Sequence, residues 1–397
     1  MSWQFVALSK VSNVFNGKTP SKLEQRDVGH PVLKIKDVDE TGVFTGDFQS
    51  FVDFDLAEKF ENKKLELDDT LILNAAHNSD YVGSKQYRAE PKVVGSLPTG
   101  EWLIARANQE YLDPRFLNYW FASPQARFQI KQLVKGIHLY PKDVSRLEIP
   151  LPPLPEQKRI AAILDKADAI RRKRQQAIQL ADEFLRSVFL DMFGDPVTNP
   201  KGWGAVKLGD ICEVGSSKRV FVDEFTEFGI PFYRGTEVGR LGENEDIQPH
   251  LYISNDHYEN LKKHSGVPKI GDLLLPSICH DGRIWKVNSK TPFYFKDGRV
   301  LWIKVNQSSI NSDYLRSYLK NLFLANYSSI ASGTTFAELK IVILKELSVL
   351  SPPLDLQIKY AEIIEKAIKK YGINKAFSEK SSKLFDSLCQ KAFAGEL

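Results

Sequence analysis

Residue types that carry enzymatic chemistry occur at several places in this sequence, but their spacing matches no complete catalytic motif. Asn199-Pro200-Lys201 begins like the Asn-Pro-Pro-aromatic motif of adenine methyltransferases, yet it lacks the second proline and the aromatic residue. Cys279-His280-Asp281 combines residue types of a nucleophile site, but nothing in the sequence orients them. The acidic groups that a Mg²⁺-dependent nuclease would need stand in turn-like settings, at Asp68-Asp69 and at Glu243, Glu245 and Asp246. We therefore expect no catalytic residue in this chain.

Motifs for nucleotides and metals are equally missing from the sequence. It contains no G-x-x-x-x-G-K-[ST] loop for phosphates and no H-E-x-x-H pair for zinc. The three cysteines, Cys212, Cys279 and Cys389, are far apart and odd in number. This spacing argues against a disulfide framework and against a zinc cluster. We expect no metal and no cofactor, and a reducing compartment, the cytoplasm.

The bulk composition is that of a globular protein. The 397 residues are enough for two domains, each with its own core. The 54 basic and 50 acidic residues give a net charge of only +4, less than many nucleic-acid-binding proteins carry. No apolar run approaches the roughly 18 residues of a membrane span, and the N-terminus does not read as a secretion signal. Composition therefore predicts no membrane association, and any prediction of DNA binding must come from the organisation of the chain.

The strongest signal is an internal repeat with an offset of two hundred residues. LPPLPEQKRIAAILDKA begins at Leu151, and SPPLDLQIKYAEIIEKA begins at Ser351. One register holds over nearly the whole chain, through the pairs Val6/Val206, Lys18/Lys218, Pro31/Pro231, Pro152/Pro352, Gln157/Gln357, Ala161/Ala361, Ile163/Ile363, Ser187/Ser387 and Phe193/Phe393. The sequence therefore predicts a duplication.

Each repeat is predicted to contain a mixed head followed by a long helix, an α+β organisation. Short apolar runs bounded by Gly, Asn and Asp predict strands, at 30–38 and 69–74 in the first head and at 230–238, 271–278 and 299–305 in the second. A helical pattern follows in each head, at 114–134 and 312–330. We predict head 1 at residues 1–150, a central spacer helix at 151–194, head 2 at 195–350 and a C-terminal spacer helix at 351–397.

The two spacer helices are predicted from sustained three-four spacing of apolar residues. Residues 156–193 contain neither Gly nor Pro, and about 38 helical residues make a rod of about 57 Å. The second copy, 355–393, has Gly372 as a weak point. A long apolar stripe needs a partner, so we expect the two helices to pair antiparallel; the alternative is that each packs only on its own head. The apolar positions expected to contact partners are Ile160, Ile163, Ala167, Phe184, Ile363, Leu384 and Leu388.

The phrase IPLPPLPEQ, followed by KRIAAILD, FGDP and NPKGWGAVKLGDICEV, resembles the specificity subunit of type I restriction–modification systems. The resemblance covers the whole chain, because the order head, helix, head, helix is the plan of that family. It implies that each head is a target-recognition domain that reads one half of a split, asymmetric site in double-stranded DNA. It also implies that the helices set the gap between the half-sites and dock two modification subunits, which are adenine-N6 methyltransferases, and that restriction subunits join them. S-adenosylmethionine, ATP and Mg²⁺ would then belong to those partners.

Three places in each head have the residue types for reading bases and holding phosphates. They are a basic turn, the loop after the central strand, and a loop after the head's helix, where the family pattern has small residues. In head 1 the candidates are Lys18, Thr19, Asn74, His77, Lys85, Arg88, His138 and Tyr140. In head 2 they are Lys218, Arg219, Arg234, His280, Arg283, Thr334 and Thr335. His138 and Tyr140 depart from the family's small-residue pattern, and Arg88 and Arg283 have the bidentate geometry that suits guanine.

Three functions are compared on this basis. The first is a non-catalytic DNA-specificity subunit, and the second is a coiled-coil adaptor whose heads bind proteins. The third is a self-contained enzyme. Salt-sensitive, sequence-selective DNA binding would separate the first from the second, and activity of the isolated chain would support the third.

Overall fold

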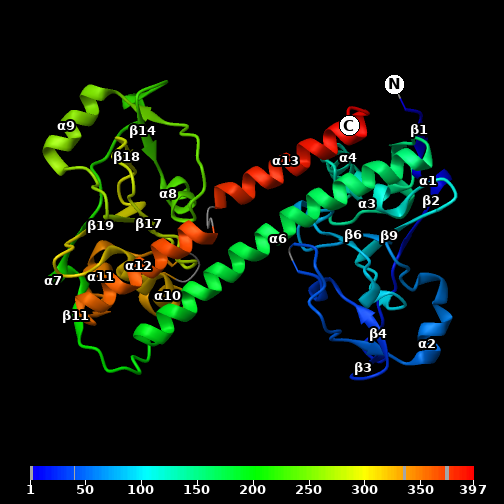
Figure 1. Cartoon of the computed structure of the whole chain (residues 1–397), viewed down its shortest axis with the longest axis horizontal. Coiled ribbons are helices and arrows are strands. Elements are labelled where there is room, and N and C mark those ends of the chain that lie inside the picture. The colour runs from blue at the N-terminus through cyan, green and yellow to red at the C-terminus, as the bar shows by residue number, and fades with distance from the viewer. Residues whose placement is uncertain (1–2, 40, 334–336, 372–374) are drawn as a thin grey trace. The chain divides into compact units, whose positions relative to one another are not determined.

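A computed structural model of the chain describes residues 3–39, 41–333, 337–371 and 375–397. The chain forms two compact units (Figure 1): unit 1 is Met1–Arg171 with Ser382–Leu397, and unit 2 is Arg172–Ser381. The boundary at Arg171 lies inside α6 (Leu154–Phe193), the central spacer helix. Each unit therefore contains one head together with parts of both predicted spacer segments.

Head 1 consists of small antiparallel and mixed sheets with short helices around them. Its main sheet has the order β2-β9-β6-β7, a second sheet has the order β3-β5-β4-β8, and β1 pairs with β10. The strands are β1 (Phe5–Ala7), β2 (Ser12–Asn16), β3 (Gln25–Arg26), β4 (His30–Leu33), β5 (Phe51–Val52), β6 (Thr70–Leu73), β7 (Gln86–Arg88), β8 (Leu97–Pro98), β9 (Trp102–Ala107) and β10 (Glu148–Pro150). The helices are α1 (Leu8–Val11), α2 (Phe54–Lys59), α3 (Pro114–Ala122), α4 (Pro124–Leu133) and α5 (Pro141–Val144).

Head 2 repeats this topology strand for strand. Its sheets have the orders β12-β19-β16-β17, β13-β15-β14-β18 and β11-β20. The strands are β11 (Ala205–Lys207), β12 (Cys212–Gly215), β13 (Phe225–Thr226), β14 (Ile230–Tyr233), β15 (Tyr252–Ile253), β16 (Leu273–Pro276), β17 (Trp285–Lys286), β18 (Tyr294–Phe295), β19 (Val300–Val305) and β20 (Ser348–Leu350). The helices are α7 (Leu208–Ile211), α8 (Gly235–Gly242), α9 (Asn255–Ser265), α10 (Ser312–Ile330) and α11 (Ile341–Glu346). The predicted duplication and the α+β class are confirmed.

One glycine in each head shows how closely the two copies correspond. Gly29 and Gly229 both have φ +140° and lie just before β4 and β14, which pair with β5 and β15. A Cβ atom would lie 2.4 Å from the carbonyl oxygen of Val52 at Gly29, and 2.4 Å from that of Ile253 at Gly229. Only glycine fits such a position without strain, which explains why the repeat keeps it.

The proline-rich phrase joins each head to its helix through a buried glutamine. The side-chain oxygen of Gln157 accepts a hydrogen bond from the Asp113 backbone N–H at 2.8 Å, and its amide donates to the Pro152 carbonyl at 2.8 Å. Gln357 makes the same two bonds, from Asn311 N–H at 2.9 Å and to the Pro352 carbonyl at 2.8 Å. Both glutamines are almost fully buried, so this repeated residue fixes the start of the spacer helix on the head.

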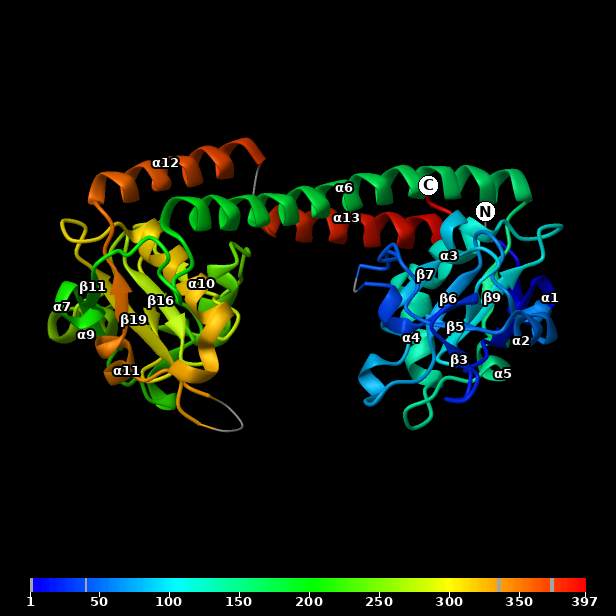
Figure 2. The same cartoon turned by 90° about the horizontal axis from the view of Figure 1, so that it is seen from below.

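In unit 1, the start of α6 and the end of α13 (Lys375–Ala394) complete the core of head 1 (Figures 1 and 2). Leu164 of α6 is fully buried, and Phe393 of α13 packs edge-on against Phe116 of α3 with ring centroids 5.0 Å apart. Arg159 donates to the Leu397 carbonyl at 2.8 Å, while Arg171 lies 5.1 Å from the centre of the Phe385 ring. These contacts show that the two helical segments run antiparallel within unit 1.

In unit 2, the end of α6 packs in the same way against α12 (Leu354–Tyr371) and α10. The rings of Phe193 and Tyr314 are 4.7 Å apart, and those of Phe189 and Tyr360 are 5.7 Å apart. Ala181 meets Ala367 further along the two helices, again in antiparallel order. Each head is therefore packed against its own spacer segment and against the end of the other one.

One helix prediction is covered only in part by the described residues, and another needs a correction. The described parts of the predicted C-terminal spacer helix are α12 and α13, and Gly372 lies outside the described residues. The pattern at 114–134 forms two helices, because Ser123 ends α3 and its hydroxyl accepts from the Ala126 N–H at the start of α4, where Pro124 fits the first turn.

The apolar positions predicted on the spacer helices differ in burial. Ile160 lies in the core of unit 1, and Ala167 and Leu388 pack against that core. Ile163 and Ile363 are half-buried. Phe184 and Leu384 are 46% and 62% exposed, so these two side chains remain open to a partner. In the described part of the chain, no helix is long and apolar enough to cross a membrane.

Candidate nucleic-acid interface

The basic turn of head 1 follows β2 and is held against the loop before β9. Lys18 N–H donates to the Pro98 carbonyl at 2.8 Å, and the Thr19 hydroxyl accepts from Gly100 N–H at 2.8 Å. The Lys18 ammonium lies 5.1 Å from the centre of the Phe60 ring. Lys63 donates to the carbonyls of Asn16 and Gly17, and burial together with the charge of Lys18 lowers the pKa of Lys63. Two cations therefore stand close together at this turn.

The loop after β6 and the loop before α5 lie side by side in head 1. Asn74 joins them, because its carbonyl accepts from Leu139 N–H at 2.8 Å and Ala75 forms a bridge with His138. The Asn74 side-chain amide donates to Asn16 Oδ1 at 2.9 Å, which ties both loops to the basic turn. The structure thus brings together the three places that were predicted separately in head 1.

The surface of these joined loops is polar and aromatic. His77 and His138 are exposed, and Tyr81 and Tyr140 are 64% and 47% exposed. The rings of His138 and Tyr140 are 6.2 Å apart. Tyr81 was not singled out from the sequence, although it lies in the same polar loop. Such side chains can donate, accept and stack, which is the chemistry that base recognition needs.

The structure buries the Asn74 side chain, so its placement does not favour the predicted contact with a base. It is only 4% exposed, and its amide also donates to the Gly100 carbonyl at 3.0 Å. We expect Asn74→Ala to lower the free energy of unfolding by about 1–3 kcal/mol, because it leaves buried groups unpaired. The exposed His77→Ala variant should change stability by less than about 0.5 kcal/mol. Chemical denaturation of both variants tests this, and equal effects would contradict the structural role.

Lys85 and Arg88 are also engaged inside unit 1. Lys85 donates to the Val38 carbonyl at 3.0 Å. Arg88 bonds to Asp165 of α6 at 2.9 Å and approaches Asp68 at 3.6 Å. The periodicity around Arg88 gave no sign of this partner, because Asp165 is 77 residues away. The predicted guanine contact of Arg88 is therefore not favoured by its placement.

In head 2 the corresponding loops also meet. Leu339 N–H donates to the Ser277 carbonyl at 2.7 Å, and Cys279 N–H donates to the Tyr327 hydroxyl at 3.0 Å. His280 is exposed, with its ring 6.2 Å from that of Tyr327. Thr334 and Thr335 lie outside the described residues.

The basic candidates of head 2 differ in how they are paired. Lys218 is exposed, and its backbone N–H donates to the Tyr294 hydroxyl at 3.0 Å. Arg219 bonds to Asp297 at 3.1 Å, Arg234 to Glu237 at 2.9 Å, and Arg283 to Asp281 at 2.6 Å. An arginine that is already paired with a carboxylate must exchange that partner to reach a base or a phosphate. Lys218 and His280 are therefore the better placed of these residues.

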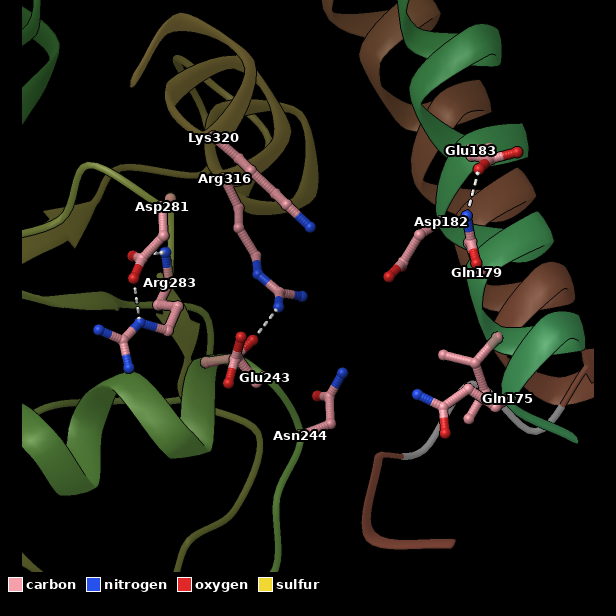
Figure 3. A pocket seen from close by; sticks show the side chains of 13 residues that line it. Gln175, Gln179, Asp182, Glu183, Glu243, Asn244, Asp281, Arg283, Arg316 and Lys320 are labelled. Atoms are coloured by element: carbon pink, nitrogen blue, oxygen red, sulfur yellow. Dashed lines mark hydrogen bonds and ion pairs between the residues drawn. The ribbon is translucent and has the colours of Figure 1, made fainter. Parts of the chain in front are cut away.

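A separate polar groove of about 370 Å³ lies within unit 2, between α6 and head 2 (Figure 3). Asp182 points into it from α6, and Arg316 and Lys320 point into it from α10. Arg316 donates to the carbonyls of Ile284 at 2.9 Å and Gly242 at 2.7 Å, and burial lowers its pKa. Since charges of both signs line the groove, it lacks the one-signed potential that would attract a phosphate backbone.

Two of the residues considered for catalysis, Asp69 and Cys279, are buried in the heads, and a third, Asn199, is bonded within a loop. Asp69 is buried and bonds to Arg106 at 2.7 Å, and burial raises the pKa of the Cys279 thiol. Asn199 accepts from Trp203 N–H at 3.0 Å within a loop. Among the residues that the structure describes, no three His, Cys, Asp or Glu side chains are grouped to hold a metal.

Two heads with the same strand order, each packed on two antiparallel helical segments, define a duplicated, two-headed protein. The family model of the type I restriction modification DNA specificity domain matches residues 1–180 and again residues 200–380. The chain therefore belongs to the family of type I restriction–modification specificity subunits.

Relatives of this family cover the chain to different extents. A putative type I restriction enzyme specificity subunit from Haemophilus influenzae is 28% identical over 228 residues, 56% of each chain; the match thus spans about half the length of that relative. The StySPI specificity subunit of Salmonella potsdam is 23% identical, covering 100% of this chain and 89% of its own. The crystal structure of the type I S subunit from M. genitalium has a TM-score of 0.59 at 16% identity, covering 99% of this chain and 96% of that one. That likeness shows a shared fold.

Proposed function

We propose that this chain is the non-catalytic DNA-specificity subunit of a type I restriction–modification complex. Each head would read one half of a split, asymmetric site in double-stranded DNA. The observation that carries the proposal is the pair of loop surfaces on heads of one topology, with His77, His138 and Tyr140 in one head and Lys218 and His280 in the other. Because the scaffold is shared and the loop residues differ, the two half-sites should differ.

The partners follow from the same proposal. The spacer helices would set the distance between the half-sites and dock two modification subunits, for which the exposed Phe184 and Leu384 are contact candidates. Restriction subunits would join this core, and the complex would work in the cytoplasm. S-adenosylmethionine, ATP and Mg²⁺ would be bound by those partners, because this sequence lacks their motifs.

The experiment is co-expression with a modification subunit, followed by mapping of N6-methyladenine in the host DNA. Methylation at one split, asymmetric motif is the expected result. If the complex assembles but methylates no motif, the DNA-reading function is wrong, and a protein-binding adaptor becomes the better interpretation.

Phosphate contact at the basic turn can be tested through salt dependence. In the assembled complex, Lys218→Ala should weaken DNA binding to all sequences about equally and reduce the slope of log K against log salt by about 1. Lys207→Ala is the control, because Lys207 lies on β11 and is ion-paired with Glu346 at 2.6 Å. A slope that stays the same in Lys218→Ala would remove this residue from the interface.

A further inference from the structure

Asp165 of α6 receives three hydrogen bonds from head 1. Arg88 of β7 donates through Nη1 at 2.9 Å, Arg115 of α3 through Nη1 at 3.1 Å, and Tyr119 of α3 through its hydroxyl at 2.7 Å. We call these four residues the Asp165 cluster. It joins a strand and a helix of head 1 to one carboxylate of the spacer helix.

The Asp165 cluster is held together by interactions that involve charged side chains. Burial alone would raise the pKa of the Asp165 carboxyl, but the hydrogen bonds from Tyr119 and Arg88 outweigh burial and lower it. The carboxylate is therefore ionised at neutral pH. The Arg88 guanidinium also lies 5.9 Å from the centre of the Tyr119 ring. Bonds between charged partners in a half-buried place are short and directional, so they oppose small rotations of the head.

Head 2 is joined to its helix differently. The position two hundred residues after Asp165 is Glu365, which is exposed on α12. Lys286 of β17 pairs instead with Asp313 of α10 at 2.6 Å, inside head 2. The hydrogen bonds of Gln157 and Gln357 align Asp113 of head 1 with Asn311 of head 2. In this alignment, Ser317 occupies the position in head 2 that Tyr119 occupies in head 1. The duplication therefore kept the buried glutamine in both copies but not the residues of the Asp165 cluster.

Apolar packing and two polar attachments hold head 1 on α6, and Leu164 of α6 is fully buried in the shared core. Gln157 holds the first turn of the helix, and Asp165 lies eight residues later, about 12 Å along the axis. Apolar contacts are not directional, so they tolerate small rotations of the head about the Gln157 attachment, and such rotations would move the loops far from the helix most. The hydrogen bonds of Asp165 are directional and oppose these rotations.

We propose that Asp165 is a positioning residue that fixes head 1 on α6 and thereby sets the register in which head 1 meets its half-site. This inference rests on the proposed function, since it needs a protein that reads two half-sites at a set spacing. Under this proposal, the spacing between the half-sites depends on the contact between head 1 and α6 as well as on the length of the helix.

The test compares DNA targets whose spacer has the native length with targets one base pair shorter or longer. The assembled complex is assayed for methylation with Asp165→Asn, Tyr119→Phe and the matched control Glu365→Gln. Asp165→Asn should reduce the preference for the native spacer about tenfold, the effect of losing one charge-assisted hydrogen bond. Tyr119→Phe should reduce it less, and Glu365→Gln should leave it unchanged.

The outcomes separate positioning from folding. A purely structural role would lower the melting temperature and total methylation without changing the ratio between spacers. An unchanged ratio in assembled Asp165→Asn overturns the proposal; if that variant does not assemble, an unchanged ratio in Tyr119→Phe does so. A wild-type complex that methylates no motif would instead refute the proposed function.

Discussion

Phe393→Ala is expected to lower the free energy of unfolding of unit 1 by about 3–5 kcal/mol, although the residue is far from head 1 in sequence. Phe393 is buried against Phe116 of α3, in a core that includes Leu164 of α6. Truncating a buried phenylalanine loses apolar burial and leaves a cavity. Because unit 2 does not contain this side chain, its stability should change little.

Hydrogen exchange of backbone amides measures the stability of each unit separately. A single unfolding curve would not separate them, because the chain has two units. Leu384→Ala is the control, because Leu384 belongs to the same helix but is 62% exposed. It should change the protection of unit 1 by no more than about 0.5 kcal/mol. Equal protection in the wild type and Phe393→Ala would mean that the end of α13 does not complete head 1.

Exchange of residues 1–150 for the matching head of a specificity subunit with a known target should change one half of the methylated motif and keep the other. β10 pairs with β1, Val6 opposite Ile149, so a junction after Pro150 leaves the sheets of head 1 intact. Each mismatched base pair costs about 1–3 kcal/mol, so a whole foreign half-site should switch preference by orders of magnitude. Methylation mapping of the co-expressed complex measures it.

The graft must keep the contacts of head 1 with the spacer helices. Residues at the positions of Phe116 and Arg115 should be retained from this chain, since they meet Phe393 and Asp165. A reciprocal exchange of residues 195–350 should alter only the other half. If either exchange altered both halves, the heads would not read DNA independently.

The sequence predicted the architecture well, because a duplication is visible without knowing any contact. The long helix 154–193 and the shared strand pattern follow from periodicity and from Pro and Gly positions. The loops expected to bind DNA were predicted from their polar residue types, and three of these segments meet around Asn74 in head 1.

Sequence reasoning is weakest where a polar residue type can serve either a ligand or the protein's own structure. Arg88 and Asn74 have side chains suited to bases, but one bonds to Asp165 and the other is buried among loop backbones. Local sequence does not reveal such partners, because they come from segments tens of residues away. Tyr119 and Asp165 were missed for the same reason, since each fits an ordinary amphipathic helix when considered alone.

The packing of α13 on head 1 has a consequence for biosynthesis. Ser382–Leu397 leaves the ribosome more than two hundred residues after head 1, which is roughly 10–40 s of translation. During that time the apolar surfaces of α3 and α6 that α13 will bury are exposed to solvent. Nascent head 1 should therefore be a substrate for chaperones. A prematurely terminated chain would keep that surface open, and proteases could distinguish it from the finished product.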